Sequence, residues 1–229
     1  MRKLQLVLAL LLTSMVGYTQ QDSQSKVKNE VYKDTLGNVI SSDVFKEKVK
    51  SGIYSYNMQV DEGNVSYVLV NKKKSEKQFS EQLQNFRNKL LTTPLPNFKL
   101  KKLDGTEVNS TSLNGKTLVF NFWFIGCKPC VAEMPLLNEV VDHYKGKSDI
   151  LFLAPALDDQ EKLIQFADKH PFSYQVLSSS KELANGMNIS SFPTHIIVDP
   201  KGVIKEVMVG GRDDINKSLI EAIDKIYNQ

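Results

Sequence analysis

In the second half of the chain, the apolar and polar positions follow patterns that alternate between strand and helix. Residues 117–124 form a nearly continuous apolar run, which is typical of a strand buried on both faces of a sheet. Residues 128–144 carry apolar positions three and four apart, which predicts an amphipathic helix. Strands that alternate with helices predict an α/β fold with a mixed sheet. The other strands are expected over 98–100, 150–156, 174–177, 195–198 and 203–209, and the other helices over 160–169, near Glu182 and from Asp213.

The preceding part of the chain has the pattern of a small α+β unit. Two short apolar stretches, 31–32 and 39–40, flank a Gly37-Asn38 turn and predict a hairpin. The elements expected after the hairpin are a helix up to Lys50 capped by Ser42 or Asp43, strands over 53–60 and 65–71 joined by a turn at 61–64, and a helix over 75–91.

The helix expected over 75–91 has one apolar face, which we interpret as a packing face rather than a ligand site. That face consists of Phe79, Leu83, Phe86 and Leu90. The three lysines 72–74 just before it are expected at a turn, on a solvated surface. Pro94 and Pro96 then mark a boundary, because proline ends helices and favours extended structure before it. The sequence therefore predicts a small N-terminal domain over 28–91 and an α/β domain over 92–229.

The first twenty residues have the pattern of a secretory signal peptide. Arg2 and Lys3 precede an apolar run over 4–16, and small and polar residues follow it. A membrane anchor is the alternative, but a spanning helix needs about 20 apolar residues and this run is shorter. No cysteine follows the run to carry a lipid. We expect a signal peptide over 1–20 and an exported, periplasmic protein without stable membrane insertion.

The charge balance gives no reason to expect a nucleic-acid partner. The 229 residues include 29 basic and 26 acidic side chains, a net charge of +3. Without Arg2 and Lys3 the balance is 27 against 26, or +1. A nucleic-acid-binding surface depends on an excess of basic residues.

The chain has two cysteines, Cys127 and Cys130, placed where a buried strand gives way to a helix. The unpaired N–H groups of a helix N-terminus favour a thiolate, and Lys128 adds a nearby cation. Pro129 suits the first turn of a helix, where its missing N–H costs nothing. The two-residue spacing lets one helical turn bring both sulfurs within disulfide reach. We expect Cys127 to be the exposed nucleophile and Cys130 the shielded resolving thiol.

Two alternatives for this pair are a purely structural disulfide and half of a metal site. A zinc site would need two further ligands. The three histidines, His143, His170 and His195, show no ligand spacing near the pair, so no metal site is expected.

Three sequence blocks in order carry a resemblance to a known family. They are the lead-in PLPNFKLKKLDGTEVNSTSLNGKTLVFNFWF, then GCKPC followed by Glu133-Met134-Pro135, then SFPTHIIVDPKGVI. Residues 97–211, about half of the chain, resemble the TlpA/ResA-like thioredoxin-family thiol–disulfide oxidoreductases of exported bacterial proteins. The resemblance implies a thioredoxin-like mixed sheet flanked by helices and reduction of protein disulfides. It also implies protein disulfide or thiol substrates, an upstream membrane electron donor, and no cofactor besides the redox-active Cys127–Cys130 disulfide.

The resemblance also implies roles for residues around the cysteines. Pro193 of the Pro193-Thr194 pair would be in cis beside the disulfide, and Phe192 would offer backbone hydrogen bonds to the substrate. Trp123 would border the site and shape an apolar substrate surface, together with Lys128 and Pro129 of the motif. Asn121 stands where thioredoxin has a buried aspartate.

Asp158 has two interpretations. It aligns with an acidic residue that some members of this family carry near the cysteines, and a carboxylate there could accept the proton of Cys130. Alternatively, either Asp158 or the adjacent Asp159 could cap the helix that starts near Gln160. His195 is interpreted as an ordinary strand residue rather than a tuner of the redox pair.

Three other protein classes are possible interpretations of the sequence. A peroxiredoxin has Thr or Ser three residues before its reactive cysteine, where this chain has Phe124. A Sco-like copper-delivery protein separates its cysteines by three residues. A non-catalytic binding module with the thioredoxin fold has no need of an intact cysteine pair. The Sco-like protein and the binding module stay as alternatives to the oxidoreductase.

Overall fold

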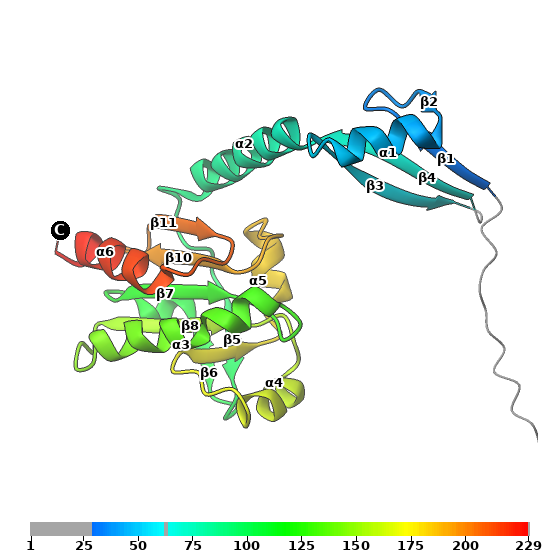
Figure 1. Ribbon diagram of the computed structural model, residues 1–229. Coiled ribbons are helices and arrows are strands. Elements are labelled where there is room, and N and C mark those ends of the chain that lie inside the picture. Colours follow the sequence, from blue (N-terminus) through cyan, green and yellow to red (C-terminus); the bar gives the residue numbers. More distant parts are fainter. Residues whose placement is uncertain (1–28, 62–63, 229) are drawn as a thin grey trace, which may run out of the picture. The chain divides into compact units, whose positions relative to one another are not determined.

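The computed structural model describes residues 29–61 and 64–228, and the chain divides into two compact units, Met1–Glu76 and Lys77–Gln229 (Figure 1). The signal peptide expected over 1–20 lies outside the described residues, as do Glu62 and Gly63 of the expected turn. Within the described ranges, no helix is both long and apolar enough to cross a membrane.

The first unit contains a four-stranded sheet in the order β2-β1-β4-β3. The hairpin is confirmed, because β1 pairs antiparallel with β2, and β1 also pairs parallel with β4. The helix α1 is capped by Ser41, whose Oγ accepts the Val44 N–H, and not by Ser42 or Asp43, which lie one and two residues inside the helix. The elements are β1 (Asn29–Lys33), β2 (Val39–Ile40), α1 (Ser42–Lys50), β3 (Tyr54–Asp61) and β4 (Asn64–Asn71).

Aromatic rings cluster around Phe45 in this unit, whose core also contains Val65 and Leu69. Phe45 of α1 is buried, and its ring centroid lies 5.0 Å from that of Tyr32, 5.7 Å from Tyr56 and 6.2 Å from Tyr67. Aromatic pairs at these separations contribute more than their buried area alone. The small α+β unit expected from the sequence therefore has a core of its own.

The helix α2 (Lys72–Leu90) begins three residues before its expected start. Lys72–Lys74 form its first turn, so their expected placement at a turn outside the helix is wrong. The Asn71 side chain accepts the Lys74 N–H at 3.1 Å, which allows the helix to start directly after β4. The expected packing face is only partly buried: Phe79 is 56% exposed, whereas Phe86 and Leu90 pack against the core of the second unit.

The second unit has the predicted α/β architecture, with a mixed seven-stranded sheet in the order β11-β10-β7-β8-β9-β5-β6. Parallel pairing joins β7 to β8 and β8 to β9, and antiparallel pairing joins the others. Its elements are β5 (Lys99–Lys102), β6 (Glu107–Asn109), the 3-10 helix η1 (Ser110–Leu113), β7 (Thr117–Phe122), α3 (Lys128–His143), β8 (Ile150–Pro155), α4 (Gln160–Ala167), β9 (Gln175–Ser178), α5 (Lys181–Gly186), β10 (Thr194–Val198), β11 (Ile204–Val209) and α6 (Ile215–Tyr227).

The strand β7 lies inside the sheet and is buried along its whole length, as its apolar run predicts. Val119 packs into the core layer that contains α3 and α6, while Phe120 and Phe122 pack into the layer on the other face. The strand ends at Phe122, two residues earlier than expected. The chain after it leads directly to Cys127 at the start of α3, so the sheet positions the cysteine pair at the carboxyl end of β7.

Candidate active site

The two cysteines form a disulfide at the N-terminus of α3, with their Cα atoms 5.3 Å apart. Cys127 is the N-cap residue, and its Sγ accepts the Cys130 N–H at 3.3 Å. Pro129 lies in the first turn, where a missing N–H leaves no helical bond unmade. One N–H of the helix N-terminus, that of Cys130, therefore points to the sulfur of Cys127.

Cys127 is 5% exposed and Cys130 is fully buried. The order of exposure agrees with the expected roles, but the expectation of an exposed Cys127 is wrong for this oxidised state. The reason is that the Cys127 sulfur is bonded to a sulfur inside the core and so turns inward. Lys128 and Pro129, between the two cysteines, are both exposed.

Two loops lie against the start of α3. The Phe192–Pro193 peptide bond is cis, as the resemblance implies, and the Pro193 carbonyl accepts the Gly210 N–H at 2.9 Å. A Cβ atom on Gly211 would lie 2.8 Å from the Cβ of Pro129, so only glycine allows this close approach. The segments before β10 and after β11 thus both lie beside the cysteine motif.

Aromatic side chains surround this junction. The Phe192 ring lies 5.5 Å from that of Phe124, edge to face, and both rings are partly exposed. Thr194 is buried, and its hydroxyl donates to the Ser191 carbonyl at 2.7 Å. The apolar surface beside the cysteines therefore includes Phe124, which the sequence analysis did not select.

Trp123 is 1% exposed, so the expectation that it shapes the substrate surface is wrong. Its backbone N–H donates to the Pro155 carbonyl, and its backbone carbonyl accepts the Leu157 N–H. These bonds continue the pairing of β7 with β8 and turn the indole into the core, where it packs 5.4 Å from the Phe166 ring.

Asp158 lies near the cysteine loop, and it does not cap α4. Its Oδ2 accepts the Ile125 N–H at 2.8 Å, whereas the N-cap position of α4 belongs to Asp159. The capping interpretation is therefore wrong for Asp158; its neighbour Asp159 holds the N-cap position, without a side-chain capping hydrogen bond. The Asp158 carboxylate instead holds the loop between β7 and α3 in place.

Glu133 and His195 form a buried pair that the sequence analysis missed. Glu133 is 4% exposed and His195 is fully buried, and the Nε2 of His195 lies 3.1 Å from the Oε2 of Glu133. The other carboxylate oxygen accepts the Arg212 N–H at 2.7 Å. The signal for Glu133 was present in the sequence, because it lies three residues after Cys130 on the apolar face of the predicted helix.

Other polar groups are buried near this pair. Asn121 lies directly opposite His195 in the ladder between β7 and β10 and is also fully buried. Burial raises the pKa of the Tyr174 hydroxyl, and the charge of Glu133 raises it further. The layer beneath the start of α3 therefore combines the resolving sulfur with a carboxylate, an imidazole and an amide.

The model of the AhpC/TSA family matches residues 91–207. The chain belongs to this family. The matched segment contains the cysteine motif, Pro193 and the Glu133–His195 pair.

Curated relatives match about half of the chain. The thioredoxin-like protein YneN of Bacillus subtilis is 32% identical over 117 residues, which are 50% of this chain and 69% of the relative. The thiol–disulfide oxidoreductase ResA of Geobacillus kaustophilus is 30% identical over 128 residues, 54% of this chain and 73% of the relative. The resemblance to thioredoxin-like thiol–disulfide oxidoreductases is confirmed.

Solved structures agree with the fold. A thiol:disulfide interchange protein of the thioredoxin family from Chlorobium tepidum matches with a TM-score of 0.50 and 26% identity, covering 58% of this chain and 97% of the other. The thioredoxin-like mixed sheet flanked by helices is therefore confirmed. Among the described residues, no cluster of three or more His, Cys, Asp or Glu side chains is arranged to hold a metal ion.

Proposed function

We propose that this protein is an exported reductase of protein disulfides, in which Cys127 is the nucleophile and Cys130 the resolving thiol. The observation that carries the proposal is the Cys127–Cys130 disulfide at the N-terminus of α3, beside the loop of Pro193. Relatives that are named thiol–disulfide oxidoreductases support the reaction class.

The reaction transfers two electrons to the substrate in two exchange steps. The Cys127 thiolate attacks one sulfur of a substrate disulfide, and the bond between the substrate sulfurs breaks to release a thiolate. The Cys130 thiolate then attacks the Cys127 sulfur, releases the second substrate thiol and leaves the oxidised pair. The helix N-terminus stabilises the Cys127 thiolate, and exposed Lys128 adds a positive charge.

Cys130 must lose a proton before it can attack, and it is fully buried. Glu133 is the nearest carboxylate along α3, because side chains three residues apart share a helix face. We assign it the role of proton acceptor, with His195 positioning its carboxylate. Asp158 stays a second candidate through its contact with the cysteine loop.

In this proposal the substrate lies over Phe124 and Phe192, next to the buried Pro193. The partly exposed rings supply an apolar surface, and the backbone of Phe192 offers hydrogen bonds to an extended substrate. Thr194 begins β10 and fixes the loop through its bond to the Ser191 carbonyl. Protein thiols and disulfides are the substrates.

Two further parts of the proposal concern the cell. The pattern of residues 1–20 supports export to the periplasm. After each turnover the Cys127–Cys130 disulfide must be reduced again, and an upstream membrane electron donor is the partner we propose for that step.

A single variant tests the order of the two cysteines. Cys130→Ser retains the nucleophile and lacks the resolving sulfur, so we expect it to accumulate mixed disulfides with insulin through Cys127. Mass spectrometry of the adduct measures this, and Cys127→Ser is the matched control that accumulates none. A Cu(I) titration beside the insulin assay tests the copper-delivery alternative; tight copper binding without insulin reduction would refute the proposal.

The role of Asp158 is tested by Asp158→Asn. The amide oxygen can still accept the Ile125 N–H, so we expect the domain to stay folded by circular dichroism. If the carboxylate accepts a proton, disulfide exchange slows across the pH range. An unchanged rate at every pH would exclude Asp158 as a proton acceptor, and its role would be the contact with the cysteine loop.

A further inference from the structure

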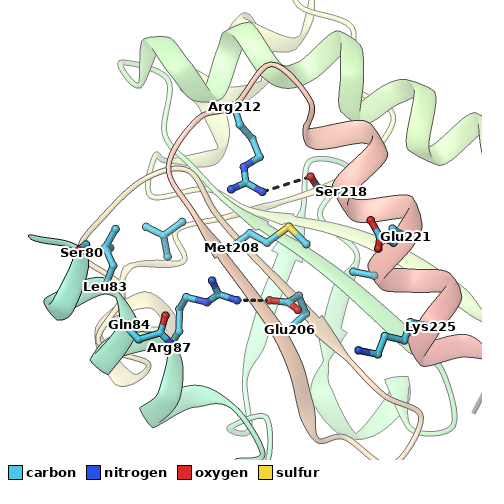
Figure 2. Close-up of a pocket in the computed structure, with 12 residues that line it drawn as sticks. Ser80, Leu83, Gln84, Arg87, Glu206, Met208, Arg212, Ser218, Glu221 and Lys225 are labelled. Atoms are coloured by element: carbon cyan, nitrogen blue, oxygen red, sulfur yellow. Dashed lines mark hydrogen bonds and ion pairs between the residues drawn. The ribbon is translucent and has the colours of Figure 1, made fainter. Parts of the chain in front are cut away.

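A groove of about 470 Å³ lies on the second unit, beside one edge of its sheet. Figure 2 shows its three sides: α2, α6, and β11 between them. In each helix the lining residues are spaced i, i+3, i+4 and i+7, which is the spacing of one helix face. The α2 side consists of Ser80, Leu83, Gln84 and Arg87, and the α6 side of Ser218, Glu221, Ala222 and Lys225.

The strand β11 is the edge strand of the sheet and pairs with β10 on one side only. On its other side, the chain after α2 pairs with the start of the strand. The Thr92 N–H donates to the Ile204 carbonyl, and the Ile204 N–H donates to the Thr93 carbonyl, both at 2.9 Å. No strand within the described ranges pairs with the rest of this edge.

The pairing with β10 shows which backbone groups face the groove. The Gly210 N–H donates to the Pro193 carbonyl, and Met208 pairs with His195 two residues before it. The backbone N–H and C=O groups of Met208 and Gly210 therefore point toward β10. In an antiparallel ladder the alternate residues, Val207 and Val209, therefore turn their N–H and C=O groups to the open edge.

The outward-facing backbone groups of Val207 and Val209 have different surroundings. The Val207 N–H donates to the Glu206 carboxylate at 3.0 Å, and Arg87 holds that carboxylate at 2.9 Å. Charged side chains commonly protect an exposed edge in this way. The protection covers Val207, and the N–H and C=O of Val209 face the groove.

We propose that this groove binds an extended segment of the disulfide-bearing protein substrate, which pairs with β11 as an added strand. The inference rests on the thiol–disulfide activity proposed above. Unpaired strand-edge groups are complementary to an extended backbone. Each helix face spans about 10 Å, which corresponds to about three residues of a strand.

The end of β11 connects the groove to the cysteines. Val209 pairs with Thr194, Gly211 lies against Pro129, and the Arg212 N–H donates to Glu133. A segment that follows β11 toward its carboxyl end therefore leads to the active site. The groove also carries charged side chains of both signs, so recognition rests on the backbone rather than on substrate charge. The charged residues are Arg87, Glu206, Arg212, Glu221 and Lys225.

The first test fills the groove. Gln84→Trp places an indole on its α2 side, and Gln82→Trp is the matched control, because Gln82 is also exposed but does not line the groove. We expect Gln84→Trp to lower kcat/KM for insulin on the order of tenfold. The rate of glutathione disulfide reduction stays unchanged, because this substrate is too short to occupy both the cysteine site and the groove. The control variant changes the rate with neither substrate.

The second test observes the added strand directly. The Cys130→Ser variant is trapped as a mixed disulfide with an insulin chain or with glutathione, and amide hydrogen exchange is measured by NMR. We expect the Val209 amide to exchange at least about tenfold more slowly in the insulin adduct. Equal exchange in both adducts, or an equal effect of Gln84→Trp on both substrates, would overturn the groove proposal. A wild-type protein that reduces neither substrate would instead overturn the proposed function.

Discussion

At the scale of single residues, the most informative feature is the buried pair of Glu133 and His195. A buried carboxylate is costly unless hydrogen bonds compensate its lost hydration. Here His195 Nε2 at 3.1 Å and the Arg212 N–H at 2.7 Å surround it. Such an arrangement holds one carboxylate in a fixed place, one helical turn from Cys130.

Replacing Glu133 by Gln tests its role as proton acceptor. The amide keeps the volume and can still accept the Arg212 N–H, but it cannot take a proton. We expect resolution of the mixed disulfide to slow about a hundredfold near pH 7. The defect should shrink as the pH rises, because Cys130 then ionises without help. Stopped-flow kinetics of a single turnover between pH 6 and 10 measure both effects.

Glu139→Gln is the control for this experiment. Glu139 is an exposed carboxylate on the same helix and accepts a bond from Asn216. It should leave the rate and its pH profile unchanged. A Glu133→Gln protein with the wild-type pH profile would exclude Glu133 as the proton acceptor.

At the scale of elements, the packing of α3 against α6 fixes the helix that carries the cysteines. Tyr144 follows the last turn of α3. Its hydroxyl donates to Asp224 at 2.7 Å, and the Ile220 carbonyl lies 3.1 Å away as a second acceptor for the same proton; both residues are in α6. Burial, and then the bond to Asp224, raise the pKa of Tyr144 above its ordinary value. The protonated hydroxyl therefore stabilises this contact between the helices.

The variant Tyr144→Phe should lower the free energy of unfolding by about 1–2 kcal/mol at pH 7. Because the folded pKa is raised, the contribution of Tyr144 is complete below about pH 10, the pKa of tyrosine in an unfolded chain, and falls as the pH rises further. Urea unfolding of both proteins at pH 7, 9 and 11 measures it. The stability gap between wild type and variant should narrow only at the highest pH; a constant gap would contradict the assigned cause.

At the scale of the whole molecule, the second unit begins inside α2. The sequence places the domain boundary at residue 92, whereas the compact unit extends from Lys77. Phe86 and Leu90 of α2 pack on its core, and Arg87 pairs with Glu206. The second half of α2 thus covers part of the second unit, although Pro94 and Pro96 lie between α2 and the rest of that unit in the sequence.

The stabilities of two fragments test these boundaries. We expect a fragment of residues 77–229 to be about 2–3 kcal/mol more stable than one of residues 92–229, chiefly from the buried apolar surface of Phe86 and Leu90. The half-exposed Arg87–Glu206 pair should add little. Urea denaturation of both fragments is the measurement. Equal stabilities would show that the second half of α2 does not stabilise the unit, and would support the boundary at residue 92.

The sequence by itself determined most elements of the α/β unit, though not β6 or η1, and the position of its reactive pair. The apolar run of β7, the periodicity of α3 and the Cys127–Cys130 spacing are local signals, because backbone conformation and burial repeat over a few residues. The resemblance added the cis bond before Pro193, which the structure confirms. The start of α2 was missed because the three lysines 72–74 favoured a turn, while Asn71 accepts a hydrogen bond in its first turn.

Only the tertiary structure decided which distant side chains meet. The pairing of β10 with β7 places His195 in the buried layer beneath α3, where it reaches Glu133 from 62 positions away in the chain. The contact between Asp158 and Ile125 and the burial of Trp123 depend on how β8 lies beside β7. Hydrophobic periodicity specifies which face of an element is buried, but strand order and register determine which residues of two buried faces touch.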